Sequence, residues 1–136
     1  GGGIDNNIGL LNLFNSTVTG NAANDGDGGG VDSGFGNSQF VIVNSTISNN
    51  SASDDGGGLW IYGPLNLYNS TVAFNRADSD GDGAGTGGGI RLDNSVPDDP
   101  TIVGFVFNTI VIGNTVGTGA NTTPNDVGVG VNNPAD

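Results

Sequence analysis

Apolar and polar residues alternate in short segments along this chain, and the segments recur at matched offsets. A triple glycine followed by an aliphatic residue opens each repeat, at 1–4, 28–31, 56–59 and 87–90. Next comes a stretch with two apolar residues two positions apart, such as Phe40 and Ile42. A third segment reads Asn-Ser-Thr-aliphatic-x-x-Asn, as at 44–50. Period-2 alternation in such short runs is typical of half-buried strands, so the pattern predicts three short strands per repeat.

The glycine triplets begin 27, 28 and 31 residues apart. One such repeat cannot bury its inner face alone, whereas stacked repeats give every strand a parallel partner about 4.8 Å away. The sequence therefore predicts an all-β solenoid, a parallel β-helix of about four to five rungs, with Ile4, Val31, Leu59 and Ile90 forming an inward ladder. We expect a single domain over 1–136 with rungs at approximately 1–27, 28–55, 56–86 and 87–124, and a closing strand or tail at 125–136.

The third segment also carries two series of asparagines. If Val18 and its equivalents point inward, so do Ser16 and its equivalents, while Thr17 points outward. The asparagines then fall at two successive corners, where asparagine tolerates a left-handed backbone and its amide can bond the same amide one rung away. Two structural ladders are predicted: Asn15, Asn44, Asn69 and Asn108 at one corner, and Asn21, Asn50, Asn75 and Asn114 at the next.

Composition and charge exclude several classes of function. The chain has 27 Gly, no Cys and no His, so disulfides and zinc sites built on Cys or His are absent. A net charge of −12 with only two basic residues argues against nucleic acid as a partner. No apolar run approaches the roughly 18 residues of a spanning helix, so no membrane insertion is expected.

Acidic residues cluster ahead of the second, third and fourth glycine triplets. The third cluster, 78–83, reads Asp-Ser-Asp-Gly-Asp-Gly, and carboxylates at alternate positions can surround one hard cation. Stacked loops would also bring carboxylates together, and these repel unless a cation lies between them. Calcium is therefore predicted; solvated acidic turns that keep the chain soluble remain the alternative. The leading ligands are Asp78, Asp80 and Asp82, supported by Asp25, Asp27, Asp54 and Asp55.

The Gly-Gly-Gly-aliphatic start and the following Asn-Ser-Thr-[Val/Ile]-x-x-Asn resemble the repeat of right-handed parallel β-helix proteins. The resemblance is to bacterial surface proteins, such as polymorphic outer-membrane proteins, and to pectate-lyase-like folds, and it covers residues 1 to about 114. It implies a right-handed coil. Enzymes on this fold use a Lys or Arg base beside calcium, or aspartates with His and Lys. This chain lacks Lys and His, and Arg stays protonated, so no enzymatic activity is expected.

The two ends suggest how the protein is used. The chain starts directly in its first repeat, as a mature subunit or a piece of a longer array would, and an unpaired strand edge is expected there. The last rung carries apolar residues on its outside, which usually marks contact with protein. The predicted subunit interface comprises Gly1, Gly2, Gly3 and Ile4 at one end and Phe105, Ile110, Ile112, Val127, Val129 and Val131 at the other.

We therefore expect a non-enzymatic structural subunit of a secreted or cell-surface fibre, a homopolymer stacked head to tail. The tail 127–131 could cover its own end, form a fifth-rung strand or add to the next subunit. One alternative is a segment of a large adhesin or autotransporter-like passenger. Another is a polysaccharide-binding β-helix that uses Trp60, Tyr62 and Tyr68 as sugar platforms, although core or interface packing also explains these aromatic residues.

Overall fold

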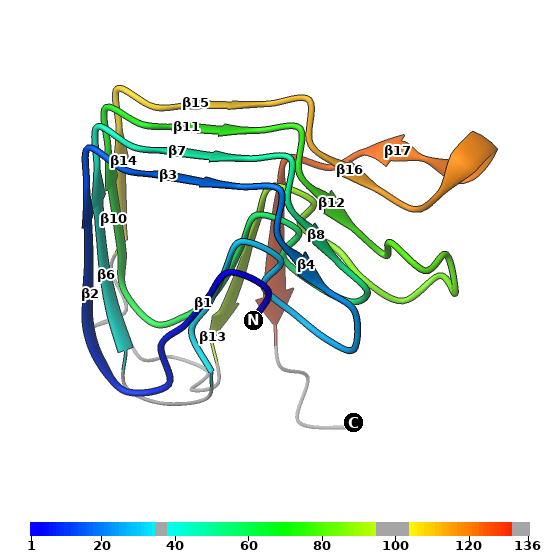
Figure 1. The fold of residues 1–136 in the computed structure, drawn as a ribbon, viewed down its shortest axis with the longest axis horizontal. Coiled ribbons are helices and arrows are strands. Elements are labelled where there is room, and N and C mark those ends of the chain that lie inside the picture. Colours follow the sequence, from blue (N-terminus) through cyan, green and yellow to red (C-terminus); the bar gives the residue numbers. More distant parts are fainter. Residues whose placement is uncertain (35–37, 95–103, 132–136) are drawn as a thin grey trace.

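The computed structural model describes residues 1–34, 38–94 and 104–131, which coil into a parallel β-solenoid of about three turns (Figure 1). Four sheets, named A to D here, form its walls. Sheet A contains β1 (Ile4–Asp5), β5 (Val31–Asp32), β9 (Leu59–Tyr62), β13 (Ile90–Asn94) and β18 (Val127–Val131). Sheet B contains β2 (Gly9–Phe14), β6 (Ser38–Val43), β10 (Leu65–Tyr68) and β14 (Phe105–Phe107).

The other two sheets follow the same order along the solenoid. Sheet C contains β3 (Thr17–Thr19), β7 (Thr46–Ser48), β11 (Thr71–Ala73) and β15 (Ile110–Ile112). Sheet D contains β4 (Ala22–Ala23), β8 (Ser51–Ala52), β12 (Arg76–Ala77), β16 (Thr115–Val116) and β17 (Thr123–Pro124). Neighbouring strands are parallel except β16 and β17, which are antiparallel.

Each rung therefore has four strands. The prediction of three strands per rung is wrong, because it missed the strand of sheet D. That strand is two residues long in every rung, too short to show alternation in the sequence. The stacking predicted from the repeats is present, since the sheets are four or five strands deep. The solenoid has about three turns, slightly fewer than the four to five rungs predicted.

The aliphatic ladder and the core follow the predicted register. Ile4 pairs with Val31, Val31 with Leu59, and Leu59 with Ile90. Val31 and Leu59 are fully buried in one cluster with the inward residues of sheets B and C. Burying each such side chain contributes roughly 1.5 to 3 kcal/mol. The described part of the chain contains no helix long and apolar enough to cross a membrane.

The three glycines of a triplet are required for three different reasons. In the third rung, Gly56 has φ +64°, a left-handed conformation that side chains disfavour. A Cβ on Gly57 would lie 2.5 Å from the carbonyl oxygen of Gly88 and closer still to the backbone of Arg76. A Cβ on Gly58 would lie 2.5 Å from the carbonyl oxygen of Gly89 and 2.9 Å from Nδ2 of Asn75. The triplet thus combines a corner, a close backbone contact and space for a buried amide.

The C-terminal segment closes two of the four sheets. After β16 the chain passes through a short 3₁₀ helix, η1 (Gly119–Asn121), and β17 returns antiparallel to β16. β18 then pairs in parallel with β13, with Val127 beside Ile90. The tail is therefore a fifth strand of sheet A, one of the three arrangements considered from the sequence, while sheets B and C end at β14 and β15.

Candidate metal centre and asparagine ladders

The first series of asparagines lies at an exposed left-handed corner between sheets B and C. Asn15, Asn44, Asn69 and Asn108 have φ values of +50° to +52°. Asn44 Nδ2 donates to Asn15 Oδ1 at 3.4 Å, and Asn108 Nδ2 donates to Asn69 Oδ1 at 3.1 Å. Asparagine suits this corner because it adopts the left-handed conformation more readily than most residues.

The second series forms a buried hydrogen-bonded ladder. Asn50, Asn75 and Asn114 are at most 1 % exposed. The backbone N–H and Nδ2 of Asn21 both donate to Asn50 Oδ1 at 3.0 Å, and Asn50 donates in the same way to Asn75. Asn75 donates likewise to Asn114 at 2.9 Å.

The sequence predicted that the second series lies at the corner itself, and this prediction is wrong by one residue. The left-handed residues of that corner come one position earlier, at Gly20, Asn49, Phe74 and Gly113. Each ladder asparagine thus follows the corner and points inward. There its amide satisfies the backbone groups that the turn leaves unpaired.

The acidic loops follow sheet D and project from one side of the solenoid (Figure 1). In the third loop, Asp78, Asp80 and Asp82 each place a carboxylate oxygen within 4.8 Å of the other two. Asp78 is 6 % exposed, and Asp80 and Asp82 are exposed. Backbone N–H groups inside the loop hold them: Gly83 donates to Asp78 at 3.1 Å and Ala84 to Asp82 at 2.7 Å. Three convergent carboxylates are ligands suited to a hard cation such as calcium.

The four aspartates predicted to support the metal site, Asp25, Asp27, Asp54 and Asp55, lie outside the cluster of the third loop. Asp27 accepts a hydrogen bond from the Asp55 N–H at 2.9 Å, and Asp55 accepts one from the Thr86 N–H at 2.6 Å. Asp27 and Asp55 therefore link successive rungs just ahead of the glycine triplets. Among the described residues, only the third loop gathers three acidic side chains within ligating distance, so the supporting four do not join it. Asp25 lines a polar hollow on the first rung.

Burial and neighbouring negative charges both raise the pKa of two of these carboxyls. Burial raises the pKa of Asp54, and the negative charges of Asp82, Asp80, Asp55 and Asp78 raise it further. Burial also raises the pKa of Asp27, partly offset by the hydrogen bond from the Asp55 N–H, while the charges of Asp55, Asp54 and Asp32 add to the increase. The aspartates thus form a column of like charge, which a cation would relieve.

Arg91 lies in a cluster of charged and aromatic side chains on sheet A. Arg91 is paired with Trp60 in the sheet register, but its guanidinium bonds Asp93 at 3.0 Å and lies 3.6 Å from Asp55. The Trp60 indole N–H donates to Asp93 at 2.8 Å. Trp60 is 5 % exposed, so this ring offers almost no face to a sugar. Arg91 therefore makes its salt bridges within the chain.

The predicted interface residues lie at the two ends of the solenoid. Ile4 is half-buried on β1, and Phe105, Ile110 and Ile112 are about half exposed on the last strands of sheets B and C. Val127 and Val129 are 49 % and 69 % exposed on β18, which also contains Val131. Gly1, Gly2 and Gly3 precede β1.

The stacked parallel strands and the buried amide ladder define the protein as a parallel β-solenoid. Comparisons of the chain with models of protein families, with curated proteins and with solved structures found no match.

The acidic column predicts a stability that depends on pH and cations together. Asp54 and Asp27 have raised pKa values, so above the ordinary value of 3.8 the folded state holds more protons than the unfolded state. Their contribution to the free energy of unfolding therefore falls as pH rises through the folded pKa values. In excess EDTA we expect this contribution to lower the melting temperature at pH 7 relative to a pH near the ordinary carboxyl value of 3.8.

Calcium should restore the stability at pH 7, by about 2.7 kcal/mol at one hundred times its dissociation constant. Thermal unfolding followed by circular dichroism measures both effects. Asp82→Asn should abolish most of the calcium increment, whereas Asp5→Asn removes the same charge from an exposed position on β1 and should preserve it. Equal melting temperatures in EDTA and in calcium would contradict the metal site.

Proposed function

We propose that this protein is a non-enzymatic structural unit of an extracellular or cell-surface fibre, in which copies stack end to end and calcium stabilises the acidic corner. The proposal rests on the location of the exposed apolar side chains, which lie mainly at the two ends of the solenoid. Among the described residues, the exposed large apolar side chains lie on the first and last rungs, except Phe74: Ile8, Leu10 and Phe14 at one end, and Phe105, Val106, Phe107, Ile110, Ile112, Val127 and Val129 at the other.

The strands at the two ends are complementary in direction and pattern. β2 and β3 each have one strand neighbour, as do β14 and β15, and all run parallel to their sheets. Continuing the register would place Leu13 of a second copy on Val106, and Val18 of that copy on Val111. Both contacts would extend the apolar core across the junction and pair the free backbone edges.

Charge sets the conditions for stacking. Each copy carries −12, so joining copies brings like charges together. Salt screens this repulsion and a bound cation neutralises part of it. The resemblance of the repeat to bacterial surface β-helices, including polymorphic outer-membrane and pectate-lyase-like proteins, supports a location outside the cell. In a long adhesin the same edges would instead meet further rungs of one chain.

A polysaccharide-binding role is the second candidate, on one observation. Tyr68 stacks on Phe107 with ring centroids 6.0 Å apart, and Phe107 on Phe105 at 6.2 Å. These rings lie on the outer side of sheet B, where the two phenylalanines are half exposed. An exposed aromatic row of this kind can mark a binding surface.

Sedimentation velocity and negative-stain electron microscopy test the stacking. We expect elongated species whose length increases with protein concentration and with calcium, because a head-to-tail contact does not close. A triple variant, Phe105→Asn, Ile110→Thr and Ile112→Thr, installs polar residues like those of earlier rungs and should weaken association.

Phe74→Asn is the matched control for this experiment. It removes an exposed apolar ring away from the ends, and asparagine already holds the equivalent left-handed corner at Asn49. This variant should associate like the parent chain. Side-to-side clusters, or equal association by the triple variant, would contradict stacking through the end rungs.

A further inference from the structure

The segment before β18 reproduces the beginning of a rung. Val127 continues the aliphatic ladder by pairing with Ile90, as Ile90 pairs with Leu59. The Ile90 N–H donates to the Asp126 carbonyl at 3.0 Å, just as the Leu59 N–H donates to the Gly89 carbonyl at 2.9 Å. Asp126 thus takes the backbone position of the third glycine of a triplet.

The side chain of Asp126 also takes the place of the next ladder asparagine. Its Oδ1 accepts from the backbone N–H of Asn114 at 3.0 Å and from Asn114 Nδ2 at 2.9 Å. Asn114 Oδ1 accepts the same two bonds from Asn75. In the fourth rung the third position must be glycine, because a Cβ on Gly89 would lie 2.5 Å from the Asp126 carbonyl oxygen and 2.7 Å from Asn114 Cγ. Within residues 115–131 no further ladder asparagine follows Asn114, and Asp126 supplies the acceptor itself.

The groups that Asp126 and Val127 supply are those that the first rung of a second copy would bring. That rung carries the Gly3 carbonyl, Ile4 and Asn21. One rung later, the equivalent groups of Gly30, Val31 and Asn50 occupy these positions relative to Ile4 and Asn21. A second copy could not place β2 on β14 and β3 on β15 in register while β18 occupies the edge of β13.

We propose that the edge formed by β13, β14, β15 and β16 binds the first rung of a second copy, and that residues 123–131 of each chain occupy the β13 and β16 parts of that site until the partner's β1 and β4 replace them. This inference rests on the proposed end-to-end stacking and says how the junction forms. Residues 125–131 make the contacts that the first rung of this chain would make, and this identifies the partner as a second copy of the same chain.

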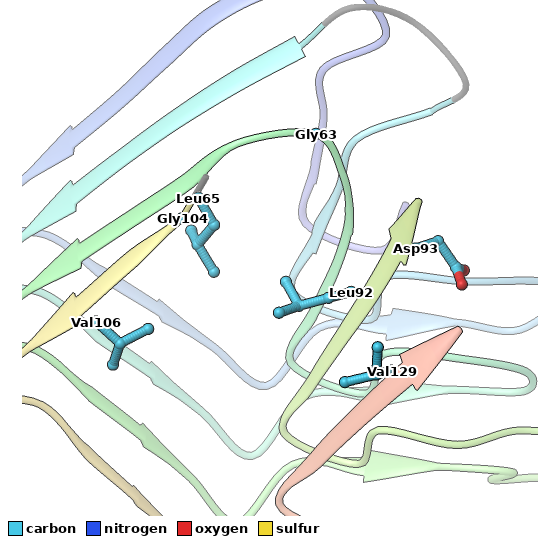
Figure 2. A pocket seen from close by; sticks show the side chains of 7 residues that line it. All are labelled: Gly63, Leu65, Leu92, Asp93, Gly104, Val106 and Val129. Carbon is cyan, nitrogen blue, oxygen red and sulfur yellow. The ribbon is translucent and has the colours of Figure 1, made fainter. Parts of the chain in front are cut away.

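β18 is suited to being displaced. It alternates valine with glycine, which weakens a strand because it offers little to pack. Val129 is 69 % exposed and borders an apolar hollow of about 200 Å³ between sheets A and B, lined also by Leu65, Leu92 and Val106 (Figure 2). An incoming rung would fill this hollow, so exchange increases the buried apolar area.

A disulfide staple tests the exchange directly. Leu92 and Val129 are register partners that face the same hollow, and the chain has no cysteine of its own. In the double variant Leu92→Cys and Val129→Cys, oxidation locks β18 onto β13. We expect the oxidised form to remain monomeric under conditions where its reduced form assembles.

A matched pair at Asp126 provides the second readout. Asp126→Ala removes the acceptor of two hydrogen bonds and should speed assembly about tenfold or more, equivalent to about 1.4 kcal/mol. Asp126→Asn keeps Oδ1 as an acceptor and should assemble at nearly the parent rate. Deleting residues 125–136 should also accelerate assembly, and circular dichroism verifies the fold of each variant.

The outcomes separate this inference from the proposed function. Assembly of the oxidised staple at the rate of its reduced form would overturn strand exchange and leave end-to-end stacking intact. Slower assembly of the Asp126→Ala chain than of the parent would also overturn it. If no variant assembles, including the deletion, stacking fails and the exchange mechanism fails with it.

Discussion

Replacing Asn75 by alanine should destabilise the protein by about 3 kcal/mol or more, because its side chain is fully buried and makes four hydrogen bonds. The backbone N–H of Asn50 would lose its acceptor, and Asn50 Nδ2, the Ile47 carbonyl and Asn114 Oδ1 would each lose one partner. Domains of this size are typically stable by only about 5 to 15 kcal/mol. Urea unfolding followed by the fluorescence of Trp60, the single tryptophan, measures the loss.

Asn69→Gly is the matched control for the ladder variant. Asn69 also belongs to a column of asparagines, but it is exposed and has φ +50°, which glycine adopts without strain. We expect a change of less than about 1 kcal/mol. If both substitutions cost the same, the buried ladder would not be the element that ties successive rungs together.

Gly57→Ala should cost at least about 3 kcal/mol or prevent folding, because the added methyl group has nowhere to go. It would lie 2.5 Å from the Gly88 carbonyl oxygen and closer to the carbonyl group of Arg76. Both neighbours are backbone of the adjacent wall and the next rung, so relief would require rungs to separate. The content of native β-structure by circular dichroism, with the midpoint of chemical unfolding, measures the effect.

The control for this variant is Gly20→Asn. Gly20 has φ +70° and no atom within 4 Å of an added Cβ, and asparagine holds the same corner at Asn49 in the next rung. The substitution should leave stability nearly unchanged. A mild effect of Gly57→Ala, comparable with that of Gly20→Asn, would contradict the close approach of the two backbones.

Much of the fold could be predicted from local pattern. Alternation shows which residues face inward, and a repeat of nearly constant length brings equivalent residues into register, so the sequence predicts the single ladder of Ile4, Val31, Leu59 and Ile90 that the structure contains. The convergence of Asp78, Asp80 and Asp82 was predictable too, since they lie within five residues of one another. The right-handed coil, calcium binding and the end-to-end stacking of copies remain predictions.

The sequence by itself thus determined the solenoid, its register and its acidic corner, because these depend on periodicity and on contacts between near neighbours in the chain. The tertiary structure alone decided the fourth strand, the burial of the second asparagine ladder and the role of Asp126. A two-residue strand has no period, so stacking on the rungs above and below defines it. Asp126 ends the ladder because the chain turns back through β17, which brings a residue from a different position of the repeat to the place of an asparagine. Such a substitution depends on where the backbone returns in space, which repeat spacing does not encode.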